Sequence, residues 1–119
     1  MTLQEEKEFL LKDVCARLPY GVKGTNQYDK ITKLDHPTDY SPYMSIKNAI
    51  LKHDWKPYLF PMSSMTEIQK IEFIALKTYV SLNKNKEYLL FDWLNANHFD
   101  YRDLIPMKLA IDATNLNIY

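Results

Sequence analysis

The sequence predicts an α+β protein with an N-terminal helix, a small antiparallel sheet, and a C-terminal helical hairpin followed by a short closing strand. Apolar residues recur at helical spacing near the N-terminus and again in the second half of the chain. The stretch between them holds both glycines and reads as short strands and turns. A length of 119 residues is typical of one domain, so residues 1–119 are interpreted as a single unit.

The N-terminal helix is expected over residues 2–18. Thr2 and Glu5 have the spacing of a capping box, in which each side chain bonds a free backbone N–H. Pro19 disfavours helical geometry at the residue before it, and Gly21 follows, so the end of the helix is well marked. The apolar residues at helical spacing are Leu3, Leu10, Leu11, Val14, Cys15 and Leu18.

The segment 19–54 predicts the sheet. A short strand at 20–23 would enter a turn at 24–26, and residues 28–34 would form its antiparallel partner. The stretch 43–52 is ambiguous: we favour a last strand there, and a short helix capped by Ser45 is the alternative. Pro57 and Pro61 then make residues 55–62 extended.

A second helix is expected from the serines and threonine at 63–66 to about Leu82. Two capping boxes compete for its start, Ser64 with Glu67 and Thr66 with Gln69. The helix has two apolar faces, which predicts burial on more than one side. One face holds Ile68, Ile71, Ile74, Ala75 and Thr78, and the other holds Phe73, Leu76 and Val80.

A third helix, roughly 86–97, would pair with the second across the polar break 83–86. Asn97 is a plausible left-handed end residue. Asp100 would cap one further turn, 101–105, and the alternation around 109–111 allows the closing strand. The inward residues of the third helix are Leu89, Leu90, Trp93 and Leu94.

Composition excludes several classes of function. The net charge is zero and evenly spread, so duplex nucleic acid is a poor partner, and self-association meets little repulsion. The single cysteine, Cys15, fits a reducing compartment, and its place in a helix favours packing over nucleophilic chemistry. An acidic N-terminus and the lack of a long apolar run predict a cytoplasmic protein without a membrane span.

Three segments of the sequence resemble an uncharacterised family of small proteins from gut-bacterial genomes and their phages or mobile elements. The segments are 15–22 (CARLPYGV), 56–66 (KPYLFPMSSMT) and 93–102 (WLNANHFDYR). They cover about a quarter of the chain, in order. The resemblance implies an intracellular origin in a bacterial cell or a phage-infected bacterial host. It implies no activity, since the family has no established function.

No pattern identifies a reaction, a catalytic residue, a metal or a cofactor. His36 and Asp39 lie in a stretch where turn chemistry explains both, and no metal-ligand spacing occurs. Ser63 and Ser64 precede a helix, and capping accounts for them without a nucleophilic role. Two glycines are too few for a phosphate-binding loop. A small hydrolase or metal enzyme is therefore the least favoured class.

Two groups of residues are candidates for binding. The aromatic segment 40–60 includes Trp55 and Tyr58, which could stack on single-stranded nucleic acid, although ordinary packing is the favoured interpretation. The second group could form a recognition edge, but a helix end with its caps explains the same residues and is favoured. Its members are Asn97, His98, Tyr101 and Arg102.

We therefore expect a non-enzymatic protein that acts through contacts with another protein, as an accessory factor of a phage or mobile element. The expectation rests on the neutral charge, the many tyrosines, the compact length and the lack of a catalytic pattern. A weak single-stranded nucleic-acid-binding accessory protein is the alternative.

Overall fold

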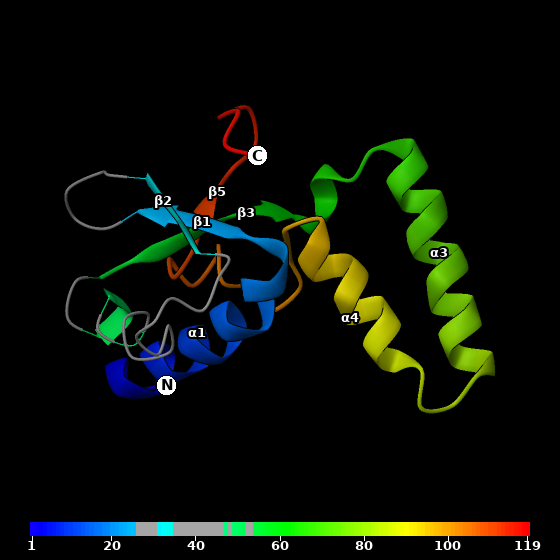
Figure 1. The fold of residues 1–119 in the computed structure, drawn as a ribbon, viewed down its shortest axis with the longest axis horizontal. Helices are drawn as coiled ribbons and strands as arrows, with labels where there is room; N and C mark the ends of the chain where they lie inside the picture. Colours follow the sequence, from blue (N-terminus) through cyan, green and yellow to red (C-terminus); the bar gives the residue numbers. More distant parts are fainter. Residues whose placement is uncertain (26–30, 35–46, 48, 52–53) are drawn as a thin grey trace.

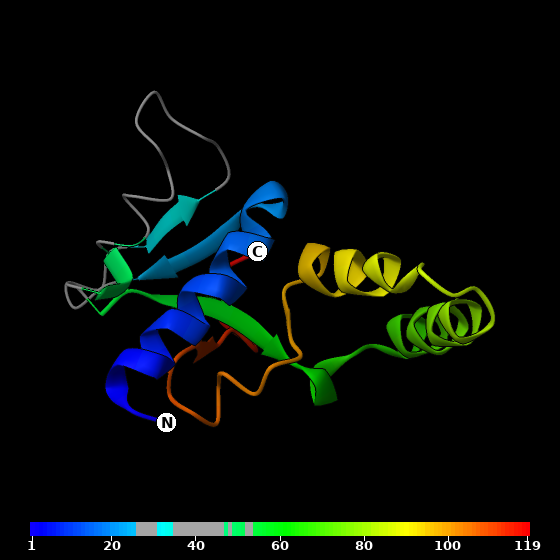
Figure 2. The same cartoon turned by 90° about the horizontal axis from the view of Figure 1, so that it is seen from below.

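The predicted α+β class is confirmed by a computed structural model, which describes residues 1–25, 31–34, 47, 49–51 and 54–119. Helix α1 lies across the sheet, and the hairpin of α3 and α4 projects to one side of them (Figure 1, Figure 2). The molecule measures 42 × 31 × 31 Å. In chain order the elements are α1 (Leu3–Arg17), η1 (Leu18–Tyr20), β1 (Val22–Thr25), β2 (Ile31–Leu34), β3 (Lys56–Pro61), η2 (Met62–Ser64), α3 (Glu67–Leu82), α4 (Glu87–Ala96), β4 (Phe99–Asp100) and β5 (Ile111–Asp112).

Helix α1 begins as the sequence predicts. Thr2 Oγ1 accepts a hydrogen bond from Glu5 N at 3.1 Å, and Glu5 Oε1 accepts one from Thr2 N at 3.2 Å, so the capping box is complete. The α-helix ends at Arg17, and Gly21 adopts a left-handed φ of 73° after the 3₁₀ turn. Leu10, Leu11 and Val14 are buried, whereas Leu3 is 67% exposed.

The sheet is mixed rather than antiparallel throughout. Its order is β2-β1-β3-β4, and β5 also pairs with β3. The β1–β2 and β1–β3 pairs are antiparallel, whereas β3 pairs with β4 and β5 in parallel. Strand β3 changes partner every two residues: β1 pairs with 56–57, β5 with 58–59, and β4 with 60–61. Parallel partners come from distant parts of the chain, which local patterns do not reveal.

The turn predicted at 24–26 is wrong for Gly24 and Thr25, which belong to β1. The rest of that turn lies outside the described residues. Gly24 is required for close approach and not for a turn, because a Cβ placed on it would lie 2.1 Å from Cζ2 of Trp55. The strand predicted in 43–52 is also corrected, since residues 47 and 49–51 are helical. Helical spacing of Ile46, Ala49 and Ile50 was the stronger signal there.

Two groups of buried residues form the core. The larger lies between α1, the sheet and the segment after β4, and it includes Val14, Ile50, Leu59 and Leu104. The smaller joins the hairpin to the sheet and contains Met65, Leu94 and Phe99. Within it, the rings of Trp93 and Phe99 stack at 5.7 Å between centroids. The base of α4 is thus fixed to the sheet.

The hairpin forms with the predicted bounds. Of the two competing capping boxes, the one with Thr66 and Gln69 is used: Thr66 Oγ1 accepts from Gln69 N at 3.1 Å. Ser64 instead donates to the Pro61 carbonyl at 2.7 Å. The left-handed residue after α4 is His98, with φ 61°, and not Asn97, whose φ is −97°.

Candidate functional site

The two aromatic candidates do not form a stacking surface. Trp55 is only 3% exposed and packs in the larger core group over Gly24. Tyr58 is half-buried in β3, and its carbonyl accepts a hydrogen bond from the Tyr119 hydroxyl at 2.8 Å. The ring of Trp55 is therefore covered in the folded chain, as the packing interpretation expects.

Arg102 belongs to a charge cluster on α1 and not to an open recognition edge. Its Nε lies 3.3 Å from Asp13 Oδ1, and its guanidinium lies over the rings of Phe9 and Tyr101. The Tyr101 hydroxyl donates to Asn95 Oδ1 at 2.9 Å. These contacts hold both predicted residues against the protein itself, with 24% of the Arg102 side chain exposed.

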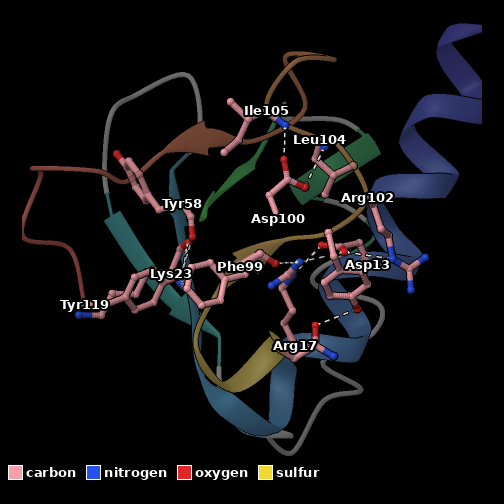
Figure 3. Close-up of polar contacts among 12 residues, drawn as sticks. Asp13, Arg17, Lys23, Tyr58, Phe99, Asp100, Arg102, Leu104, Ile105 and Tyr119 are labelled. Atoms are coloured by element: carbon pink, nitrogen blue, oxygen red, sulfur yellow. Dashed lines mark hydrogen bonds and ion pairs between the residues drawn. The ribbon is translucent and has the colours of Figure 1, made fainter. Parts of the chain in front are cut away.

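At the centre of this cluster is a fully buried ion pair between Asp13 and Arg17, both 0% exposed (Figure 3). Arg17 Nε donates to Asp13 Oδ2 at 2.8 Å, and Arg17 Nη2 donates to the Phe99 carbonyl at 2.8 Å. The guanidinium also lies 5.1 Å from the centre of the Tyr101 ring. The pair thus joins α1 to β4, and its role is structural.

Asp100, which the sequence places as a cap, does cap the following turn. Its two carboxylate oxygens accept from the backbone N–H groups of Leu104 and Ile105, at 2.9 and 2.8 Å (Figure 3). Asn97 Nδ2 donates to the Trp93 carbonyl, as expected of a helix end.

His98 stacks on Tyr119, with the ring centroids 3.6 Å apart and an angle of 9° between the planes. The Tyr119 hydroxyl accepts from Lys23 N at 2.8 Å and donates to the Tyr58 carbonyl, so it bridges β1 and β3 one residue beyond their last pair (Figure 3). The His98 carbonyl accepts from Phe60 N at 2.8 Å. His98 is therefore part of the sheet's architecture.

His98 also lines a pocket of about 360 Å³ beside the start of α3. Its Nδ1 is buried and has no hydrogen-bond partner among the described residues. The Ser64 hydroxyl at this pocket donates a hydrogen bond to the Pro61 carbonyl, as in a capping or turn role. The polar lining residues are Ser64, Thr66, Gln69, Asn97, His98 and Tyr119.

Burial lowers the pKa of His98 to about 4, and the positive charges of Arg17 and Lys23 add to the effect. The folded protein thus holds His98 neutral, while the unfolded chain takes up a proton near pH 6.5. Because the unfolded state binds more protons between about pH 6.5 and pH 4, stability must fall as the pH falls through this window. The ring is partly exposed, so solvent screening reduces the contribution to about 1 kcal/mol between pH 7 and pH 5.

The measurement is urea unfolding of the wild type and of His98→Asn at pH 7, 6 and 5. Asparagine tolerates the left-handed backbone at this position and has no charge to titrate. We expect the wild type to lose more stability than the variant on acidification. If the free energy of unfolding falls equally with pH in the two proteins, folding does not change the pKa of His98.

The largest feature that the sequence interpretation missed is the outer face of α3. Although α3 has 16 residues, none is buried. Ile68, Ile71 and Ile74 are 69%, 68% and 64% exposed, and Leu82 is 78% exposed. Burial of this helix on more than one side was predicted, and that prediction is wrong for the isolated chain. We define the outer face as Ile68, Ile71, Ile74, Ala75, Thr78 and Leu82, all exposed.

The outer face lies opposite the side of α3 that packs on α4. Phe73, Leu76 and Val80 are half-buried, and Phe73 contacts Trp93 of α4 at 5.9 Å between ring centroids. Residues two positions apart on a helix are about 200° apart around its axis. Ile71, Ile74 and Thr78 each precede one of those residues by two positions. The signal was present in the sequence: a hairpin supplies only one neighbour to a helix with two apolar faces.

The fold and its surfaces define a small α+β protein with a projecting helical hairpin. Comparison of the chain with protein-family models, curated proteins and solved structures finds no match in any of the three. Within the described part of the chain, no three His, Cys, Asp or Glu side chains gather as they would around a metal ion. No helix among the described residues combines the length and apolarity that a membrane crossing needs.

Proposed function

We propose that this protein acts by binding another protein chain through the outer face of α3. The observation that carries the proposal is the exposure of three isoleucines, each about two thirds exposed, on a helix that has no buried residue. Contiguous apolar patches of this kind are uncommon on monomers and mark interaction sites. The function is thus binding, and no reaction is assigned.

The energetics support an interface. Full burial of an isoleucine side chain gains about 1.5–3 kcal/mol, so the outer face offers several kcal/mol that the isolated chain does not use. The helix does not need this face for its own formation, because its start is capped by Thr66 and its other side packs on α4. An apolar helix face of this kind binds partners through residues spaced three and four apart.

The test is affinity capture from a lysate of the organism that encodes the chain, after nuclease treatment. The baits are the wild type, the double variant Ile71→Glu/Ile74→Glu, and the matched control Leu3→Glu. Leu3 is an equally exposed apolar residue, but it lies on α1. The wild type and the control should capture the same protein, which can be a second copy of this chain. The double variant should lose that protein, because two carboxylates would be buried unpaired.

Equal capture by all three baits would contradict the proposal. Nucleic acid recovered without nuclease treatment, and equally by the three baits, would favour the single-strand alternative. The burial of Trp55 makes that alternative less attractive, since its ring is not available to stack. A role as an accessory factor in a bacterial or phage-infected cell stays a prediction from the sequence resemblance.

A further inference from the structure

We infer that the partner on the outer face of α3 is a second copy of this chain, with the two α3 helices antiparallel about a two-fold axis near Ala75. This inference rests on the proposed function and names its partner. A narrow seam with small residues at its centre runs along the outer face, the two ends of α3 differ in charge, and the exposed apolar area fits a modest homodimer.

The seam has coiled-coil spacing. Its residues recur at intervals of three, four, three and four, which places one narrow stripe along the helix. Large side chains occupy both ends, and the smaller Ala75 and Thr78 lie at the middle. Small central residues let two helix backbones approach closely where they cross. The stripe consists of Ile68, Ile71, Ala75, Thr78 and Leu82.

Charge favours the antiparallel orientation. The first part of α3, residues 67–74, has two acidic residues and one basic residue, a net charge of −1. The second part and the following turn, residues 75–86, have three lysines and no acidic residue, a net charge of +3. An antiparallel pair places the acidic part of one helix beside the basic part of the other, whereas a parallel pair places lysines beside lysines. The helix dipoles are also opposed in the antiparallel pair.

The area is sufficient for a weak but specific dimer. Five large apolar side chains lie on the outer face or, in the case of Tyr79, beside it next to Ala75, and they are 46–78% exposed: Ile68, Ile71, Ile74, Tyr79 and Leu82. If each buries on the order of 100 Å², the partners together bury on the order of 1,000 Å². Specific interfaces begin near this size. Since the whole chain is neutral, two copies meet no net repulsion. An interface at this lower limit of size predicts a weak dimer that dissociates on dilution.

Sedimentation velocity tests the inference over a concentration series from about 1 to 500 µM. The wild type and the control Leu3→Glu should convert from monomer to dimer across this range. Ile71→Glu/Ile74→Glu should stay monomeric, with dimerisation weakened at least about 100-fold. Both substituted residues are exposed in the monomer, so circular dichroism and thermal unfolding should show that this variant still folds.

Disulfide trapping tests the orientation, in a chain that carries Cys15→Ser. A mixture of the Ile68→Cys and Leu82→Cys proteins should form a mixed disulfide dimer, because antiparallel pairing places these positions together. Leu82→Cys alone should not cross-link, since the two copies of position 82 lie at opposite ends of the seam. The reverse pattern would show a parallel pair and overturn the antiparallel arrangement. The cross-link requires Cβ atoms about 3.5–4.5 Å apart, so it reports register as well.

The outcomes separate this inference from the proposed function. A wild type that is monomeric at all concentrations, yet captures a different protein through α3, overturns the second-copy inference and leaves the proposed function standing. A dimer that survives Ile71→Glu/Ile74→Glu overturns the inference, because its interface lies elsewhere. A concentration-dependent dimer lost in that variant, with the antiparallel cross-link, supports it.

Discussion

Replacement of Asp13 by alanine is expected to lower the free energy of unfolding by about 3–5 kcal/mol. The substitution leaves the guanidinium of Arg17 fully buried without its carboxylate partner. Two hydrogen bonds from Arg17 to Asp13 are lost, and the remaining one goes to the Phe99 carbonyl. Arg102 loses the same partner. The guanidinium groups of Arg17 and Arg102 are then left without the carboxylate that both contact, and their positive charges repel each other.

Chemical denaturation followed by circular dichroism measures this effect. The double variant Asp13→Leu/Arg17→Met is the decisive comparison, because a buried ion pair exchanged for apolar residues of similar volume often costs little. We expect the double variant to be more stable than Asp13→Ala. If Asp13→Ala loses less than about 1 kcal/mol, the buried pair does not hold α1 to β4.

Helices α1 and α3 could be predicted because their signals are local. Thr2 with Glu5, and Thr66 with Gln69, each place a capping box within four residues, and both boxes form. Pro19 and Gly21 mark the end of α1 by a signal that is just as local. The capping pattern alone does not choose between Ser64 and Thr66, because both have a partner three residues on; in the structure Ser64 donates to the carbonyl of Pro61 at the end of β3.

The sheet could be predicted only in part. The hairpin of β1 and β2 joins neighbouring segments, so the local sequence pattern predicts their pairing. The parallel pairs of β3 with β4 and β5 join residues about 40 to 50 positions apart, and β4 and β5 have two residues each. Strands of two residues have no detectable alternation of their own. Strand β4 is held by packing of Phe99 in the smaller core group, whereas β5 follows Leu109 and Ala110, which pack in the larger group.

The contacts of the candidate site residues also could be predicted only in part. Asn97 and His98 line a pocket before strand β4, whereas Tyr101 and Arg102 follow β4 and contact Arg17 and Asp13 of α1. An Asp and an Arg four positions apart on a helix are ordinary on a solvated face. Burial of Asp13 and Arg17 depends on Phe99, 82 positions after Arg17, and no local pattern contains it.

Replacement of Gly24 by alanine is the second substitution with a large expected effect. The new Cβ would lie 2.1 Å from Cζ2 and 2.5 Å from Cε2 and Cη2 of Trp55. The indole ring is 3% exposed in the larger core group, so it has little room to move away. Overpacking of a close-packed core costs about 1–3 kcal/mol of stability. We expect Gly24→Ala to lower the free energy of unfolding by an amount at the upper end of this range.

A double-mutant cycle with Trp55→Leu tests the cause of that loss. Leucine removes the six-membered ring that meets the new Cβ, so Gly24→Ala should cost much less in this background than in the wild type. We expect a coupling energy of at least about 1 kcal/mol from urea unfolding. Additive costs would show that the alanine acts through the backbone of β1. Strong coupling would instead establish that glycine is needed at position 24 because Trp55 packs directly against the strand.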